Sequence, residues 1–402
     1  MRKRFLKRDF MKIAGIIAEY NPFHMGHAHH ISQTRQKTGA DYIICVISGN
    51  FSQRGECMVY DKWTRAHSAL LCGADLVLEL PFLYATQSAE GFARGGVDVL
   101  NALGCIDYLS FGAENTDTSA LLDAAALLLE EPPEFSTALK EQLSCGVSFP
   151  SARAYALASF LPQHCESTFT GSNNILGIEY CKELLRIGSK ISPFVLKREG
   201  NEYSSRMLSD TYSSATAVRA AILHGRDYRG HVPAKCLPLY QEACAVSPEA
   251  MFPHVIYALR MLGINGLREI AEVAEGLEHK ISACAKDVQS YDGLIHAIKS
   301  KRYTYTRIQR ILLYALFGVT KQALACAMEE PLYARVLGVR KKSMELLSLI
   351  SRQTHIPLVT KAAEFPDGSL LHYDLLSSDI YGLFTKKIAP AGRDFTQKLM
   401  II

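Results

Sequence analysis

The sequence has no long uninterrupted apolar run and only one tryptophan among its 402 residues. A membrane-spanning helix needs about twenty consecutive, mostly apolar residues, so we expect no membrane segment. The first ten residues, MRKRFLKRDF, are basic and do not contain the apolar stretch of a signal peptide. We therefore expect residues 1–10 to be a disordered basic extension, and the protein to be cytoplasmic.

Cysteine motifs are missing as well. The eleven cysteines are scattered, odd in number and without a C-x-x-C pair, which argues against a disulfide framework and against a zinc ribbon. We expect free thiols, most of them buried as small apolar side chains. The sequence predicts no metal site built from the protein's own residues.

The overall net charge is small, +4, but it is unevenly distributed. Residues 1–12 carry six Lys or Arg and one Asp, and residues 301–350 carry nine Lys or Arg and three Glu. The rest of the chain is mildly acidic. A basic C-terminal segment on such a chain predicts a polyanionic partner for that segment.

Residues 13–30, IAGIIAEYNPFHMGHAHH, join a predicted strand to a predicted helix. The isoleucines are typical of a buried strand, and Pro22 interrupts it. His24 and His27 then lie three residues apart at the start of the helix, where backbone N–H groups and the helix dipole favour an anion. Gly26 allows close approach of a ligand. This arrangement predicts a phosphate site.

The four histidines of this stretch allow two other interpretations. His24, His27, His29 and His30 could form a metal-binding tract, or simply the polar face of a helix, because short motifs often occur by chance. The strand before them and the N-P-F turn favour the phosphate site.

Strands and helices alternate along the chain to residue 129, and after two or three helices to about residue 189 a fifth strand and a short helix follow to residue 224. Such alternation predicts a Rossmann-like α/β fold, with a parallel sheet covered by helices on both faces. Ligands of such sheets bind beyond the carboxyl ends of the strands. The predicted strands after the first are 41–48, 75–80, 107–111 and 191–197, and the predicted helices are 61–72, 88–103, 118–129 and 213–224.

A polar linker around residues 225–238, with Pro233 and Pro238, marks the predicted domain boundary. We expect an α/β domain over residues 11–225 and a mainly helical domain over residues 226–402. Ile308, Ile311, Leu312, Ala315 and Leu316 have the spacing of an amphipathic helix.

Two further segments could bind anions. In SSATAVR, Ser214 and Thr216 place hydroxyls at a helix start, and Arg219 follows one turn later, a pattern suited to phosphates or to an ordinary helix cap. The loop 49–56, beside Lys62 and Arg65, could hold a carboxylate substrate or RNA, or could be an ordinary polar loop.

The segment around His24 resembles the strand–H-x-G-H–helix signature of nucleotidyltransferases that cleave ATP between its α- and β-phosphates. SSATAVR resembles their second signature, S-[ST]-x-x-[IV]-R. Over residues 11–360 the chain closely resembles the bacterial tRNA(Met) cytidine acetate ligases, in the segments AEYNPFHMGH, SGNFSQRGE, GADLVLELP, FGAEN, SNNILGIEY, SSATAVR and KRYTYTRIQRILL. Met25 stands where the family commonly has Asn, and Cys57 where it has Pro.

The resemblance implies a ligase that uses ATP to activate acetate as acetyl-adenylate. The acetyl group would then pass to N4 of the wobble cytidine of elongator tRNA(Met), giving N4-acetylcytidine without acetyl-CoA. Residues 11–225 would form the nucleotidyltransferase-like ATP-binding domain, and residues 226–402 would contribute to tRNA binding. Mg²⁺ should accompany the triphosphate, bound mostly through substrate oxygens. No obligate protein partner is expected.

His24 and His27 are the expected catalytic residues. Their side chains, with a reference pKa of ~6.5, would be driven toward the protonated form by the polyphosphate and would stabilise charge on the α-phosphoryl oxygens. Ser214, Thr216 and Arg219 are expected to bind the β- and γ-phosphates. The resemblance also assigns nucleotide binding to Ile17, Ala18, Glu19, Tyr20, Asn21, Pro22, Phe23, His24, Met25, Gly26, His27, Ala28, His29, His30, Gly112, Asn173 and Arg198.

Basic and aromatic residues alternate in KRYTYTRIQR, a pattern suited to phosphates and unstacked bases. A solvated face on a core helix is the alternative. The resemblance favours RNA contact, and the predicted RNA-binding residues are Lys301, Arg302, Arg307 and Arg310.

Two other functions remain open at this stage. A small-metabolite adenylyltransferase would share the ATP site but would leave the basic C-terminal segment unexplained. A non-catalytic RNA-binding protein with a relic nucleotide site would not need His24, His27 and Arg219 intact.

Overall fold

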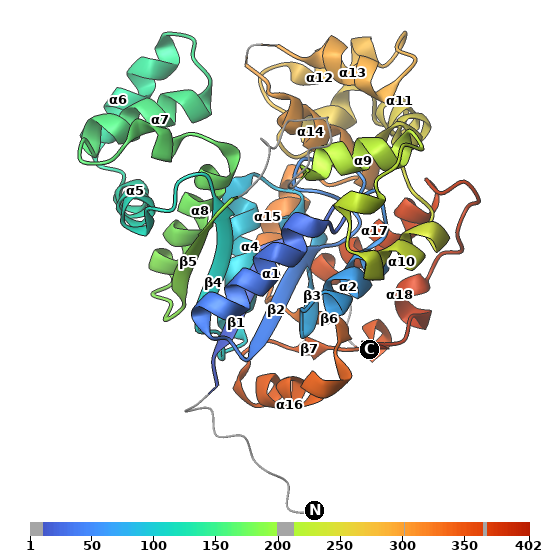
Figure 1. Cartoon of the computed structure of the whole chain (residues 1–402). Coiled ribbons are helices and arrows are strands. Elements are labelled where there is room, and N and C mark those ends of the chain that lie inside the picture. Colours follow the sequence, from blue (N-terminus) through green and yellow to red (C-terminus); the bar gives the residue numbers. More distant parts are fainter. Residues whose placement is uncertain (1–10, 199–212, 301, 365–367) are drawn as a thin grey trace, which may run out of the picture.

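The computed structural model describes residues 11–198, 213–300, 302–364 and 368–402 (Figure 1). The predicted extension, residues 1–10, and Lys301 lie outside the described residues. A single mixed sheet has the strand order β5-β4-β1-β2-β3-β6-β7, with β8 paired to β6. The strands are β1 (Ile13–Ala18), β2 (Tyr42–Ser48), β3 (Leu76–Leu80), β4 (Tyr108–Ala113), β5 (Ser192–Lys197), β6 (Ala334–Val339), β7 (Leu358–Val359) and β8 (Met400–Ile401).

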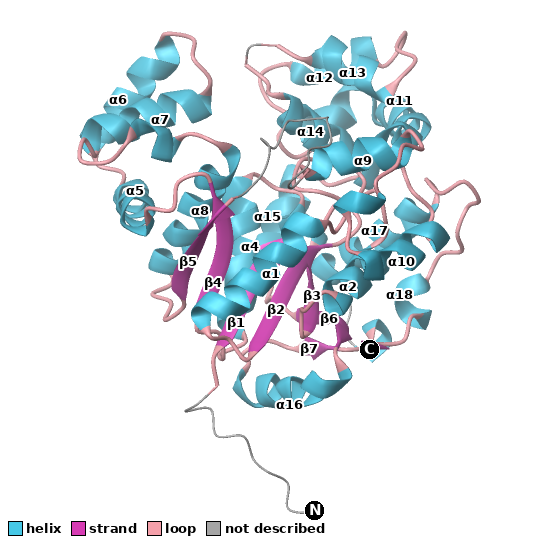
Figure 2. Ribbon diagram, in the orientation of Figure 1, coloured by secondary structure: helices cyan, strands magenta, loops and turns pink. Residues whose placement is uncertain are grey.

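Helices surround the sheet and account for most of the remaining chain (Figure 2). In the part of the chain that is described, none of them is long and apolar enough to cross a membrane. They are α1 (Met25–Thr38), α2 (Lys62–Leu71), α3 (Phe82–Ala85), α4 (Ala89–Ala102), α5 (Thr118–Glu130), α6 (Pro133–Ser144), α7 (Phe149–Phe160), α8 (Ser172–Arg186), α9 (Ala215–Leu223), α10 (Leu237–Glu242), α11 (Phe252–Glu269), α12 (Leu277–Cys284), α13 (Tyr291–Ile298), α14 (Tyr305–Phe317), α15 (Lys321–Glu329), α16 (Met344–Gln353), α17 (Ser369–Gly382) and α18 (Arg393–Thr396).

The strands β1 to β5 pair parallel with one another, which confirms the predicted Rossmann-like α/β fold. Side chains alternate along β1 between two buried clusters. Ala14 and Ile16 pack on the face covered by α1 and α2, whereas Ile13 and Ile17 pack on the face covered by α4 and α8. Because both faces are covered, the strand is apolar throughout. Gly96 lets α4 come close, since a Cβ there would lie 2.7 Å from Cδ1 of Ile17.

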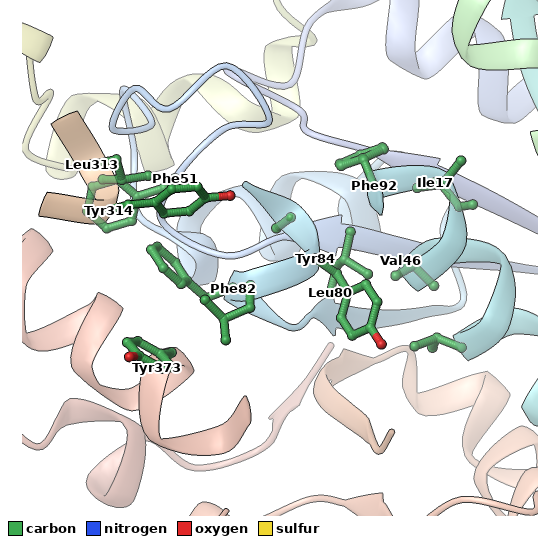
Figure 3. Close-up of a cluster of buried hydrophobic side chains, with 14 of the residues drawn as sticks. Ile17, Val46, Phe51, Leu80, Phe82, Tyr84, Phe92, Leu313, Tyr314 and Tyr373 are labelled. Carbon is green, nitrogen blue, oxygen red and sulfur yellow. The ribbon is translucent and has the colours of Figure 1, made fainter. Parts of the chain in front are cut away.

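The C-terminal part of the chain returns to this core. In Figure 3, Ile17 of β1 and Phe92 of α4 lie in the same apolar cluster as Tyr314 of α14 and Tyr373 of α17. The Tyr314 hydroxyl donates a hydrogen bond to the Thr86 carbonyl at 2.8 Å. Helices near the C-terminus therefore pack directly against the first α/β units.

The predicted boundary near residue 225 does not separate the sheet from a second domain. Strand β6 pairs antiparallel with β3, and β7 and β8 pair with β6. Residues 226–402 thus contain a helical segment, α10 to α15, followed by strands of the central sheet. The run ARVLGV is short and apolar, so its periodicity did not distinguish a strand from part of a helix.

Two helical groups stand beyond the sheet on the side toward which β1 and β2 run. Figure 1 shows α6 and α7 at the upper left and α11 to α14 at the upper right. In these views the carboxyl ends of the parallel strands lie below and between them (Figures 1 and 2).

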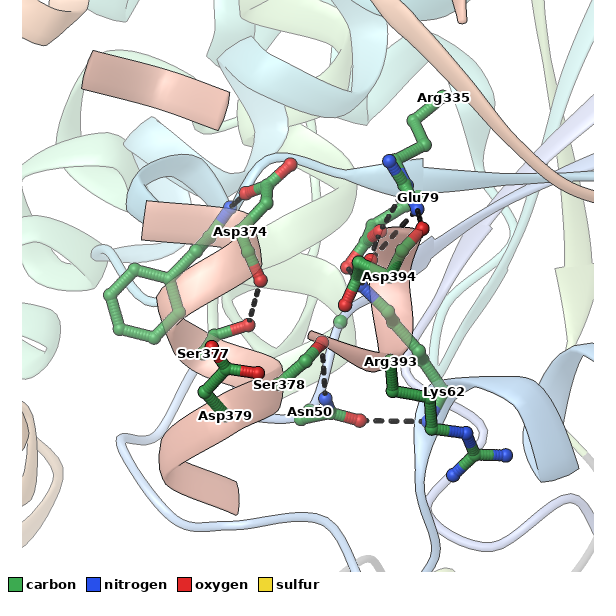
Figure 4. Close-up of polar contacts among 12 residues, drawn as sticks. Asn50, Lys62, Glu79, Arg335, Asp374, Ser377, Ser378, Asp379, Arg393 and Asp394 are labelled. Atoms are coloured by element: carbon green, nitrogen blue, oxygen red, sulfur yellow. Dashed lines mark hydrogen bonds and ion pairs between the residues drawn. The ribbon is translucent and has the colours of Figure 1, made fainter. Parts of the chain in front are cut away.

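A buried cluster of four charges links the C-terminal strands to the rest of the sheet (Figure 4). Lys62 Nζ lies 2.8 Å from Glu79 Oε1 and 2.7 Å from Asp394 Oδ1. Arg335 Nη2 lies 2.8 Å from Asp394 Oδ1, and Arg335 Nε lies 3.3 Å from Glu79 Oε2. Burial alone would lower the pKa of Lys62, but Asp394 and Glu79 raise it, so the ammonium stays charged. Lys62 is therefore a structural residue and does not belong to a substrate or RNA site.

We predict that Lys62→Ala destabilises the fold strongly. Removing the ammonium leaves two buried carboxylates facing one guanidinium, and breaking such a buried pair typically costs about 3–5 kcal/mol. Urea unfolding followed by far-UV circular dichroism should show a much lower midpoint. As a control, Lys361→Ala removes an exposed ion pair to Glu364 and should leave the midpoint unchanged. Equal midpoints for both variants would contradict the structural role of the cluster.

Candidate active site

A cavity of about 330 Å³ opens at the carboxyl ends of β1, β4 and β5. Its wall is contributed by the end of β1, the first turns of α1, the loop after β2, the start of α8 and the start of α9. This is the location that a parallel α/β sheet predicts for its ligand. Fifteen of the predicted nucleotide-binding residues line it: Ile17, Ala18, Glu19, Tyr20, Asn21, His24, Gly26, His27, His29, His30, Gly112, Asn173, Arg198, Ser214 and Arg219.

The two histidines of the H-x-G-H segment are fixed by the backbone at the start of α1. His24 is the N-cap residue, and its Nδ1 accepts a hydrogen bond from the Gly26 N–H at 3.1 Å. In return, Nδ1 of His27 accepts a hydrogen bond from the His24 N–H at 3.2 Å. The two rings stack with their centroids 3.8 Å apart. A side chain at Gly26 would crowd this pair, since its Cβ would lie 2.9 Å from Cε1 of His24.

These hydrogen bonds determine which ring nitrogen carries the proton. Because Nδ1 of each ring accepts a backbone N–H, a neutral imidazole must carry its hydrogen on Nε2. His24 and His27 therefore each have an Nε2–H donor that the backbone does not use. Two hydrogen-bond donors, held side by side at a helix N-terminus, are suited to phosphate oxygens.

Burial holds these imidazoles in their neutral form in this structure. Burial, followed by the charges of Arg198 and Arg219, lowers the pKa of His24 to about 3. Burial and Arg198 lower the pKa of His30 to about 4, and burial lowers that of His27 well below its usual value, with smaller effects of His24 and His30. The same arginines that lower these values would favour a bound polyphosphate, which acts on the imidazoles in the opposite direction.

The turn between β1 and α1 is held by distant parts of the chain. Arg219 Nη1 donates to the Asn21 carbonyl at 2.7 Å, and the Tyr240 hydroxyl donates to the Phe23 carbonyl at 2.8 Å. Arg65 Nη1 donates to the Glu19 carbonyl at 2.7 Å. Arg65 is fully buried and also donates to carbonyls at the end of β2, so it supports the turn and is not a substrate ligand.

Gly112, Asn173 and Ser214 lie in the cavity wall, as predicted. Gly112 lies under Arg198, where a Cβ would be 3.0 Å from Cγ of the arginine. Asn173 Nδ2 donates to Glu114 Oε1 at 2.6 Å, and Ser214 caps α9 through the Ala217 N–H.

Five predicted residues are absent from the cavity wall. Pro22 and Phe23 are buried, Met25 is exposed, Ala28 lies on α1, and Thr216 accepts a hydrogen bond from Arg219 at 3.1 Å.

Several polar residues in the cavity wall were not among the predicted site residues. Gln33 and Lys37 line the cavity from α1, and Gln53 and Arg54 line it from the loop after β2. Gln33 and Lys37 follow His30 by three and seven residues, so they share its helix face, and this spacing was the available signal. The loop 49–56 was considered, but its sequence did not distinguish a site from an ordinary loop.

The predicted RNA-binding arginines differ in how far their guanidinium groups are exposed and free of contacts within the protein. Arg310 is buried, and its Nε and Nη2 both lie 2.8 Å from the Glu272 carboxylate, so its prediction as an RNA contact is wrong for this structure. Arg307 also makes contacts within the protein, since it donates a hydrogen bond to the Glu272 carbonyl and stacks on the ring of Tyr303. Arg302 remains 70% exposed beside Glu275.

The fold and the paired histidines define a nucleotidyltransferase of the H-x-G-H class. A family model described as HIGH Nucleotidyl Transferase matches residues 11–395. The tRNA(Met) cytidine acetate ligase of Acetivibrio thermocellus is 40% identical over 98% of this chain and 100% of its own length. That of Caldanaerobacter subterraneus is also 40% identical, over 96% of this chain and 98% of its own length. The chain belongs to the family of tRNA(Met) cytidine acetate ligases.

Solved structures agree with this assignment. The crystal structure of Thermotoga maritima TmcAL in its apo form matches with a TM-score of 0.91 and 34% identity, covering 98% of this chain and all of that one. The structure of the same Thermotoga protein bound with alpha-thio ATP matches with a TM-score of 0.89.

We predict that His24 makes the fold less stable in acid. Its pKa is about 3 in the folded chain and ~6.5 when unfolded, so below pH 6.5 the unfolded chain binds one more proton, and stability falls by about 1.4 kcal/mol per pH unit. His24→Asn keeps a hydrogen-bond acceptor for the Gly26 N–H but does not titrate. Between pH 7.5 and pH 5, urea unfolding of the variant should lose roughly 2 kcal/mol less than the wild type. An equal decrease in the free energy of unfolding for the wild type and the variant would show that the folded protein does not hold His24 in its neutral form.

Proposed function

We propose that this protein uses ATP and acetate to form acetyl-adenylate and transfers the acetyl group to N4 of the wobble cytidine of elongator tRNA(Met). The observation that carries the proposal is the pair of backbone-fixed imidazoles, with free Nε2–H donors, in a cavity that also contains Arg198 and Arg219. Family membership supports the reaction, and the alpha-thio ATP bound by the Thermotoga relative supports the nucleotide. The tRNA substrate would make this a cytoplasmic enzyme.

The first step is a displacement at the α-phosphorus. An acetate oxygen forms a bond to phosphorus, the bond to the bridging oxygen breaks, and pyrophosphate leaves. Negative charge increases on the phosphoryl oxygens, where fixed donors act most strongly. We assign this stabilisation to His24 and His27, and we assign binding of the β- and γ-phosphates to Arg219 and the start of α9. Arg219 is already fixed by the Asn21 carbonyl, so little reorganisation is needed.

We propose that Mg²⁺ enters with the triphosphate and is bound mainly by its oxygens. Within the described residues, no group of three or more His, Cys, Asp or Glu side chains is arranged to hold a metal ion. The metal would neutralise phosphate charge and orient the leaving pyrophosphate, while the histidines and arginines act on the oxygens from the protein side.

We predict that His27→Ala lowers pyrophosphate release from ATP and acetate by about a hundredfold or more, because losing one such donor typically costs ~3 kcal/mol. Pyrophosphate and modified nucleosides are measured together, the latter by mass spectrometry. His67→Ala on α2, away from the cavity, is the control and should behave as wild type. Near-wild-type turnover by the His27 variant would remove the catalytic assignment. AMP attached to a metabolite would favour an adenylyltransferase, and wild-type protein without ATP turnover would favour a relic site.

We propose that Arg302 and Arg307, next to Tyr303 and Tyr305, contact the tRNA backbone. Arg302 is exposed and begins the approach to α14. Arg310 is excluded from this set because it is buried and paired with the Glu272 carboxylate. This set carries positive charge and aromatic rings on one short segment, as RNA recognition requires.

We predict that Arg302→Ala weakens tRNA binding and lowers the slope of log K against log salt by about one, as expected for one lost phosphate contact. The measurement is a filter-binding or fluorescence titration at several salt concentrations. Lys361→Ala, which removes a different exposed positive charge that also belongs to an ion pair, serves as the charge-matched control. An unchanged affinity and slope for the Arg302 variant would place the RNA interface elsewhere.

A further inference from the structure

Among the residues that the structure describes, one acidic side chain lies in the wall of a cavity otherwise suited to anions. Glu19 directly follows β1, is half-buried and lines the same cavity as His24, His27, Arg198 and Arg219. A carboxylate at this place repels a triphosphate and acetate, both of which are negatively charged. We therefore reassign the Glu19 carboxylate from the nucleotide, to which the family resemblance assigned it, to a different ligand group.

The carboxylate is held in position by the protein backbone. Its Oε1 accepts a hydrogen bond from the Gln53 N–H at 2.8 Å. The Glu19 carbonyl accepts from the buried guanidinium of Arg65 at 2.7 Å. Within the part of the chain that the structure describes, Oε2 accepts no hydrogen bond, so Glu19 has one fixed oxygen and one oxygen available to a ligand.

The surroundings of Glu19 suit a flat aromatic ring with a polar edge. Ile17, Phe92, Phe111 and Tyr180 contribute apolar surface to the same cavity. Tyr180 lines the same cavity as Glu19. Burial, followed by the charge of Glu19, raises the pKa of its phenol, so the phenol stays neutral. Apolar and aromatic walls bind bases, and a carboxylate accepts hydrogen bonds from the exocyclic amine of cytosine.

We infer that Glu19 accepts a hydrogen bond from the N4 amino group of the wobble cytidine and takes its proton during acetyl transfer. This inference rests on the proposed function. The N4 lone pair is delocalised into the ring, so the amine is a weak nucleophile and benefits from a base within hydrogen-bond reach.

The step balances as follows. N4 forms a bond to the acetyl carbon of acetyl-adenylate, and the bond from that carbon to the AMP oxygen breaks. AMP leaves with the electron pair, and the proton lost from N4 passes to the carboxylate of Glu19 and from there to water. The products are N4-acetylcytidine, AMP and one proton. Glu19 therefore acts in the second half-reaction, whereas His24 and His27 act in the first.

The test separates the two half-reactions in Glu19→Gln. Exchange of labelled pyrophosphate into ATP, with acetate present, measures the first step, and nucleoside mass spectrometry of the tRNA measures the second. We expect exchange to stay within about threefold of wild type and acetyl transfer to fall by about a hundredfold or more, the usual contribution of a general base. Binding of tRNA should be unchanged.

Three comparisons make the outcome specific. Glu19→Asp keeps a carboxylate and should restore part of the transfer and its pH dependence, which Glu19→Gln should lose. Glu90→Gln changes an exposed glutamate of α4 that pairs with Lys182 and is not part of the cavity wall, and it should leave both steps unchanged. The transfer defect should also be independent of Mg²⁺ concentration.

Several results would overturn the inference. Equal loss of both steps would make Glu19 part of the nucleotide site, rescue by high Mg²⁺ would make it a metal ligand, and unchanged transfer would deny it any role. If wild-type protein forms no N4-acetylcytidine from ATP, acetate and tRNA, the proposed function itself fails, which is a different and recognisable result.

Discussion

The reciprocal hydrogen bonds at the start of α1 are the constraint on which the site depends. Each of the two imidazoles uses Nδ1 to cap a backbone N–H, which leaves an Nε2–H donor on both rings. The same two hydrogen bonds cap the N-terminus of α1 and fix the orientation of both imidazole rings. The local fold and the phosphate site therefore depend on the same interaction. Gly26 is required because a side chain there would collide with His24. Burial keeps both rings neutral until a polyphosphate enters.

The turn before α1 is supported from across the whole chain. Arg65 of α2, Arg219 of α9 and Tyr240 of α10 each donate to a carbonyl of this turn. Strand β6 then closes the sheet on β3, and the buried cluster of Lys62, Glu79, Arg335 and Asp394 fixes that junction. The turn that carries the two histidines is therefore held by residues of α2, α9 and α10, and the sheet that carries the turn is tied to α18 through Asp394. This arrangement provides the preorganisation that electrostatic catalysis needs.

Much of the α/β half followed from local sequence. Apolar runs, such as the one that Pro22 interrupts, and helix-start patterns such as the one at Ser214 located the strands and helices, because such signals act over a few residues. The H-x-G-H segment likewise contained its own hydrogen-bond partners. Contacts between residues far apart in the sequence could not be predicted from it. Examples are the pairing of β6 with β3, the ion pair of Arg310 with Glu272 and the ion pair of Lys62 with Asp394. No local pattern identifies a partner that lies tens or hundreds of residues away in the sequence. For the same reason, family resemblance was needed to select Asn173 and Arg198.

The central claim is that His24 and His27 donate to the phosphates of ATP. A crystal structure of this protein with a non-hydrolysable ATP analogue tests it most directly. We predict that Nε2 of both histidines lies within hydrogen-bond distance of phosphate oxygens, with Arg219 on the same triphosphate. Phosphates bound away from the turn between β1 and α1 would contradict the account.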